Sequence, residues 1–192
     1  MDEASKQAVI AHILKVHKGL RERALPTIVT MRTENGKNNI FMTDLTEQGK
    51  NEVVSLPDWL TGKERKGKYS ETEHMVEIAN IHEISESLAI IFEQSIATGC
   101  KFNFADVFFL VVDKESKRGK VLLGDLAEIE FVDVGDITER ETLADHNYQT
   151  ILHFVREMRS HLQGEERFSM NPILAKKKEF SAMFKSIKSS NV

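Results

Sequence analysis

The stretch from Phe104 to Val134 constrains the fold of this chain more than any other. Its first part, Val107 to Val112, is the densest apolar run of the sequence, and such a run is typical of a strand buried on both faces. A polar turn follows, and Val121 to Leu123 supplies a second apolar segment. From Ala127 to Val134 apolar and charged residues alternate at first, as in a strand with one buried face. We therefore expect three consecutive antiparallel strands, a meander that forms the centre of the fold.

Long amphipathic helices are predicted on both sides of this meander, because apolar residues recur there at helical spacing. One helix is expected from Ala4 to Arg23 and another from Thr138 to Gly164. The apolar stripe of the second fits either a core face or the seam of a dimer. Ser70 to Gly99 is predicted as one continuous helix, with a strand ahead of a shorter helix as the alternative for residues 71–82.

The N-terminal third adds short strands that are rich in β-branched residues. They are expected at Thr27 to Glu34, Asn39 to Thr43 and Glu52 to Leu56, and the first two form a hairpin across Asn35-Gly36. Together with the meander and the helices, this indicates an α+β fold with a mostly antiparallel sheet packed by two or three long helices.

A separate feature closes the chain. Asn171-Pro172 is a strong helix start signal, since asparagine caps a helix and proline fits its first turn. The helix that follows has an apolar face and a basic remainder. Its face contains Ile173, Phe180, Phe184 and Ile187, with Met183 beside them, and its nearest lysines are Lys176, Lys177 and Lys178. We expect residues 1–164 to form one α+β domain, and residues 165–192 to form a linker and a basic amphipathic helix that looks detachable. Its apolar face packs either on its own domain or on a partner.

Composition limits the classes of protein to which the chain can belong. No apolar run reaches the roughly 18 residues that span a membrane, so no membrane partner is expected. The single cysteine, Cys100, favours a reducing compartment, and the N-terminal sequence does not resemble a signal peptide, so a cytoplasmic location is expected.

The net charge is −4, and the charged residues are unevenly distributed along the sequence. Residues 125–145 hold eight carboxylates against Arg140, whereas residues 167–192 hold six bases against Glu179.

Candidate catalytic patterns are present but badly placed. Glu115-Ser116-Lys117, with Asp106 or Asp113 upstream, has the local pattern of a metal-dependent nuclease. It falls at a predicted hairpin tip, which would not hold metal ligands rigidly. Glu128 and Glu130 lie on one strand face, which is more simply its solvated side. We therefore expect no catalytic residues.

No metal or cofactor is expected either. Glu71-x-x-His74 is half of a di-iron motif whose second half does not occur in the sequence. His146, His153 and Glu157 share a helix face without further ligands, and a solvated face is the preferred interpretation. Cys100 follows a helix C-terminus, where the dipole disfavours a thiolate. Neither a phosphate-binding loop nor a dinucleotide fingerprint occurs.

Two functions remain. The first is a non-enzymatic interaction or assembly protein that docks a partner or a second copy through the C-terminal helix, and that self-associates through the Thr138–Gly164 helix. The alternative is a nucleic-acid-binding or nuclease-like protein. It would use the basic loop 63–68, whose charged side chains suit a phosphate backbone and lie near aromatic residues in the sequence. The bases of that loop are Lys63, Arg65, Lys66 and Lys68.

Overall fold

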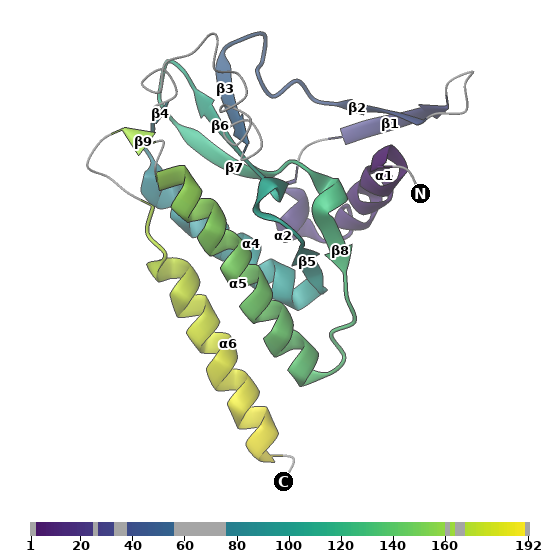
Figure 1. The fold of residues 1–192 in the computed structure, drawn as a ribbon, viewed down its shortest axis with the longest axis vertical. Helices are drawn as coiled ribbons and strands as arrows, with labels where there is room; N and C mark the ends of the chain where they lie inside the picture. The colour runs from purple at the N-terminus through teal and green to yellow at the C-terminus, as the bar shows by residue number, and fades with distance from the viewer. Residues whose placement is uncertain are drawn as a thin grey trace.

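The computed structural model describes residues 3–24, 27–32, 38–55, 76–159, 162–163 and 168–190. It has the expected α+β architecture, with small antiparallel sheets packed against long helices (Figure 1). The helices are α1 (Glu3–Leu14), α2 (Lys18–Arg21), α4 (Ile81–Thr98), α5 (Ile137–Arg159) and α6 (Asn171–Ser190), with short 3₁₀ turns η2 (Ala105–Val107) and η3 (Leu126–Glu128). The strands are β1 (Thr27–Arg32), β2 (Asn38–Met42), β3 (Asn51–Ser55), β4 (Val76–Glu77), β5 (Cys100–Phe102), β6 (Phe108–Asp113), β7 (Gly119–Leu123), β8 (Ile129–Phe131) and β9 (Leu162–Gln163).

The central sheet has the order β3-β6-β7, and both pairings are antiparallel. Leu110 of β6 lies opposite Val54 of β3 on one side and Val121 of β7 on the other. The apolar run therefore forms the middle strand of this sheet, as its two buried faces require. The predicted hairpin between β6 and β7 is confirmed, and so is the hairpin between β1 and β2.

The third strand of the expected meander pairs elsewhere. β8 does not follow β7 in the sheet but pairs with β5, with Cys100 opposite Phe131. The turn η3 redirects the chain, because the Asp125 carboxylate accepts a hydrogen bond from Ala127 N at 3.1 Å. Gly99 makes the second sheet possible: it ends α4 at φ 75°, and a Cβ there would collide with the Val132 carbonyl oxygen.

The N-terminal helix is shorter than predicted and is broken at residues 15–17. Leu14 and Leu20 are both buried. Six residues of a continuous helix would place them about 120° apart around its axis, so the break turns Leu20 back to the core. His17 lies at the break and stacks on Phe131 with a centroid distance of 5.7 Å. Val9 and Val16, which have the spacing of an apolar helix face together with Leu20, are exposed.

Residues 76–82 follow the alternative interpretation, and the continuous helix is wrong there. Val76 and Glu77 form β4, which pairs in parallel with β9. Asn80 precedes α4 and bonds the start of β7 in both directions, accepting from Gly119 N at 2.7 Å and donating to Gly119 O at 3.0 Å. These side-chain bonds fix the residue before α4 to the central sheet. Residues 70–75 lie outside the described residues.

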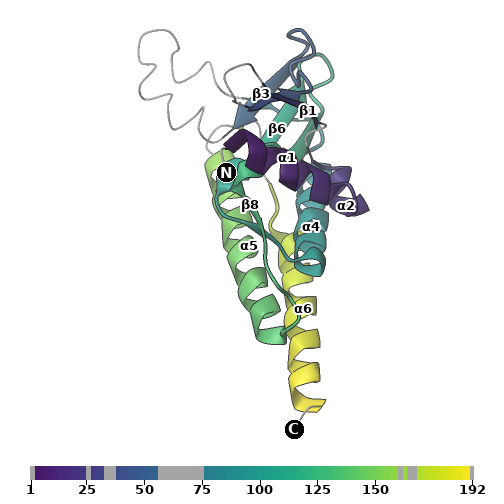
Figure 2. The same ribbon diagram turned by 90° about the vertical axis from the view of Figure 1, so that its right-hand side faces the viewer.

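Helices α4, α5 and α6 form one layer beneath the sheets (Figures 1 and 2). The α5 stripe is buried within the chain, and Ile151, Val155 and Met158 are fully covered. Of the two alternatives for this stripe, the core face is therefore the one that the structure has. Leu162, expected on the same helix, belongs to β9. Within the described ranges, no helix is long and apolar enough to cross a membrane.

Candidate functional site

The C-terminal helix begins at Asn171 as predicted and packs against α4 and α5. Ile173 is 0% exposed and Phe184 is 2% exposed, and both belong to the same apolar cluster as the rest of the core. Phe180 is half-buried and meets Phe92 edge-on with a centroid distance of 6.2 Å. Three of the five apolar residues expected to bind a partner are therefore occupied within the chain itself.

The remaining two apolar residues of α6 face solvent. Met183 is 44% exposed and Ile187 is 43% exposed. They are four positions apart, so they are neighbours on one side of the helix. They lie near its C-terminal end, where Figure 2 shows α6 extending beyond the start of α5.

The lysines of α6 bridge the three-helix layer. Lys176 Nζ lies 3.1 Å from Glu93 Oε1 of α4, and Lys177 Nζ lies 2.8 Å from Asp145 Oδ1 of α5. Lys188 pairs with Glu141, whereas Lys178 is exposed. Asp145 and Glu141 belong to the acidic stretch of residues 125–145. The charge asymmetry of the sequence is thus partly satisfied inside one chain.

The segment before α6 is also anchored. Phe168 is 1% exposed, Arg159 donates to its carbonyl, and Ser169 N donates to Ser85 Oγ of α4 at 3.1 Å. The expectation of a detachable helix is therefore revised: from Phe168 onward the tail completes the core. Charge and helix spacing predicted the helix, but they carried no information about which surface its apolar face covers.

The nuclease-like motif occupies a hairpin tip, as expected. Asp113 Oδ1 accepts hydrogen bonds from Ser116 N at 2.7 Å and Ser116 Oγ at 2.8 Å. Lys50 Nζ lies 3.4 Å from Asp113 Oδ2. The Ser116 bonds, with help from Lys50, lower the pKa of Asp113 to about 2. This carboxylate stabilises the turn, and Glu115 beside it is exposed.

The surroundings of the candidate cysteine and histidines do not form a catalytic or metal site among the described residues. Burial raises the pKa of the Cys100 thiol well above its usual value, which disfavours a thiolate. His146 is turned inward, with Nε2 at 2.8 Å from Phe102 O, while His153 is exposed. Across the described ranges, His, Cys, Asp and Glu do not gather in groups of three that could hold a metal ion.

Asn147 is a buried polar residue that was not predicted from the sequence. It is 0% exposed and lies in the middle of α5. Its Nδ2 donates to Ser95 Oγ at 2.9 Å and to Cys100 O at 2.8 Å, and its Oδ1 accepts from Phe102 N at 3.1 Å. The side chain thus satisfies the free edge of β5 and ties it to α4. An asparagine inside an apolar stripe is the one sequence signal that could have revealed it.

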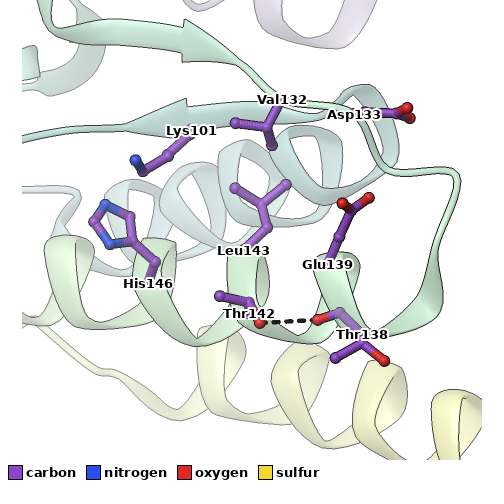
Figure 3. A pocket seen from close by; sticks show the side chains of 8 residues that line it. All are labelled: Lys101, Val132, Asp133, Thr138, Glu139, Thr142, Leu143 and His146. Carbon is purple, nitrogen blue, oxygen red and sulfur yellow. Dashed lines mark hydrogen bonds between the residues drawn. The ribbon is translucent and has the colours of Figure 1, made fainter.

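A pocket of about 440 Å³ lies between α5 and the β5–β8 side of the molecule (Figure 3). Lys101 and Val132 approach it from the strand side, and Glu139, Leu143 and His146 approach it from α5. Asp133, Thr138 and Thr142 complete its wall. Lys101 Nζ lies 3.4 Å from Glu130 Oε2. In the described part of the chain, the Glu139 carboxylate forms no ion pair.

The basic loop 63–68 and the half-motif Glu71-x-x-His74 lie outside the described residues. The nucleic-acid alternative, which depends on Lys63, Arg65, Lys66 and Lys68, therefore stays a prediction from sequence.

Comparison with known proteins adds no relative to this description, because the chain matches no protein-family model, no curated protein and no solved structure.

Proposed function

We propose that this protein is a non-enzymatic interaction or assembly protein, and that the second copy of the chain is its partner. The observation that carries the proposal is the exposure of Met183 and Ile187 on a helix whose other face is buried. Two large apolar side chains side by side on a rigid element are typical of a protein contact.

The surroundings of these residues favour a second copy as the occupant. Lys185 is exposed on the same end of α6, and within the described residues it forms no ion pair. Asp136, exposed just before α5, lies close enough to Lys188 for that lysine to contribute to its lowered pKa, after the Thr138 hydrogen bonds as the main cause. We call Met183 and Ile187 the end patch. Lys185 is two positions from each of them and therefore lies on another side of the helix, so charged groups of both signs surround this end of α6 without forming part of the apolar surface.

An apolar surface on a rigid helix can pair with its own copy across a two-fold axis. The same surface serves both copies in such a contact, so Met183 and Ile187 of one copy meet those of the other. A stable interface buries about 800 Å² on each partner, so the contact has to extend beyond the two apolar side chains onto the charged groups around them.

Light scattering of the full chain tests the proposal. We expect a particle of twice the chain mass of 21.9 kDa, which becomes a monomer in the double variant Met183→Ser/Ile187→Ser. Val9→Ser/Val16→Ser is the matched control, because it removes two exposed apolar residues from α1 and should leave the dimer intact.

The charged rim gives a second readout. The screening length between exposed charges falls to about 3 Å at 1 M salt. The dimer should therefore dissociate at a higher protein concentration in high salt than in low salt. A monomer at every concentration tested, or equal effects of the two double variants, would contradict the proposal.

The nucleic-acid alternative is tested separately by a salt-dependent gel shift with single-stranded DNA. It requires binding at low salt that is lost when Lys63, Arg65, Lys66 and Lys68 are neutralised together. Binding at low salt that survives the neutralisation would exclude the loop as its site.

A further inference from the structure

The pocket above α5 has ends of opposite charge. In Figure 3, Lys101 and His146 lie at one end, and Glu139 and Asp133 lie at the other. Glu139 and His146 are seven residues apart on α5, which places them about 10 Å apart along the helix. An extended small molecule fits this length better than a single ion.

The cationic end retains free donors. The Lys101 side chain is 32% exposed, and its ammonium has three N–H donors, of which the ion pair with Glu130 uses only part. His146 is fixed in place, because Phe102 O can only accept, so Nε2 carries the hydrogen of their 2.8 Å contact. The ring therefore forms a rigid wall beside the lysine rather than a mobile side chain.

The anionic end is also open. In the described residues the Glu139 carboxylate has no hydrogen-bonding or ionic partner, and Figure 3 shows it pointing from α5 toward the strand side. Asp133 reinforces the negative charge, although its Oδ1 also accepts from Gly135 N at 2.9 Å. A ligand ammonium here would gain a charge-assisted hydrogen bond.

The centre of the pocket is apolar. Leu143 is 3% exposed and forms its floor, and Val132 faces it from the strand side (Figure 3). The two hydroxyl-bearing residues at the edge do not make the centre polar, because Thr142 Oγ1 donates to Thr138 O at 2.9 Å. An apolar centre between a few polar groups is the usual arrangement of a small-molecule site.

We propose that this pocket binds a small zwitterion that carries a carboxylate and an ammonium at opposite ends of an aliphatic chain. The carboxylate lies at Lys101, the ammonium lies at Glu139, and the chain covers Leu143 and Val132. The site is independent of the end patch and of self-association.

Titration of the full chain with 6-aminohexanoate, followed by NMR, tests the proposal. Hexylamine and hexanoate are matched probes, because each keeps the aliphatic chain and one charged end. We expect 6-aminohexanoate to shift the signals of Leu143 and His146 and to bind about tenfold more tightly than either probe, since each lost charged contact costs that much.

Variants assign the two ends. Glu139→Gln should lower the affinity for 6-aminohexanoate about tenfold and leave the affinity for hexanoate unchanged. Lys101→Met should also lower the affinity for 6-aminohexanoate about tenfold, but leave the affinity for hexylamine unchanged. Glu115→Gln and Lys120→Met are control variants at exposed positions of the β6–β7 hairpin. Equal affinities for all three probes, shifts outside the pocket, or affinities unaffected by Glu139→Gln and Lys101→Met would overturn the proposal.

Discussion

Lys177 Nζ lies 2.8 Å from Asp145 Oδ1 and 4.4 Å from the centroid of the Tyr148 ring. A residue of the last helix thus meets two residues one turn apart on α5. This contact joins the basic end of the sequence to its acidic stretch within one chain. It also orients α6 antiparallel to α5, because Lys188, further along α6, pairs with the earlier residue Glu141.

The Lys177 contact should contribute little stability despite its good geometry. Asp145 is 71% exposed, and exposed ion pairs contribute about 0.2–1 kcal/mol, with a similar amount from a cation over an aromatic ring. A double-mutant cycle of Lys177→Met and Asp145→Asn, followed by urea unfolding, should give a coupling below about 1 kcal/mol. Lys178→Met, on the exposed side of α6, is the control. A coupling of several kcal/mol would mean that this pair, not the apolar face, holds α6.

The apolar face of α6 should dominate its docking. Phe184→Ala removes a side chain that is 2% exposed and should lower the free energy of unfolding by about 3–5 kcal/mol. Its neighbour Met183 is exposed, so Met183→Ala should change that free energy by about 0.5 kcal/mol or less. Urea titrations of both variants compare the two faces directly, and similar losses would show that Phe184 is not buried in solution.

Asn147 should be more important than its polarity suggests. Asn147→Ala leaves Phe102 N and Cys100 O buried without partners, and we expect a loss of about 2–4 kcal/mol. Gln149→Ala on the exposed side of the same helix is the control. Thermal unfolding measures both, and an Asn147→Ala variant as stable as the control would rule out the network.

The acid stability of the hairpin depends on Asp113. Its folded pKa of about 2 lies below the ordinary 3.8, so its contribution is present above about pH 4 and is lost as the pH falls toward 2. The wild-type chain should therefore lose more stability than Asp113→Asn between pH 4 and pH 2. Chemical unfolding at each pH measures the difference, and parallel pH profiles would contradict the assignment.

Asp106 should affect the pH dependence of stability in the opposite direction. Burial, together with the nearby Asp125, raises its pKa, and its Oδ1 is buried without a partner among the described residues. The ionised form is thus disfavoured in the folded state, and stability is lost as the pH rises. Asp106→Asn should stabilise the chain at pH 7 and have little effect in acid. Destabilisation at pH 7 would show that Oδ1 has a partner in solution.

Local sequence patterns predicted the positions of helices and strands better than they predicted which of these elements pair or pack together. The apolar run at Val107 to Val112, the stop at Gly99 and the start at Asn171 all fall where expected, because each depends on neighbouring residues. The pairing of β8 with β5 depends instead on the Asp125 turn and on the lack of a side chain at Gly99. Helical periodicity cannot detect such contacts.

The candidate sites show the same limit. Residue spacing identified the apolar face of α6, but not that Ile173 and Phe184 complete the core and leave Met183 and Ile187 outside. The pocket was not predicted at all. Lys101 and Glu139 belong to segments that are distant in sequence, and only the β5–β8 pairing brings them to one cavity.

Helix α6 docks on its own chain in this structure. A Lys177→Cys/Asp145→Cys variant treated at high dilution with a short bis-maleimide tests it, since both positions reach solvent and native Cys100 is buried. Each single-cysteine variant serves as a control. On a denaturing gel and by mass spectrometry, we expect one chain with an internal crosslink. A covalent dimer from the double variant would contradict this docking and place α6 on a second copy.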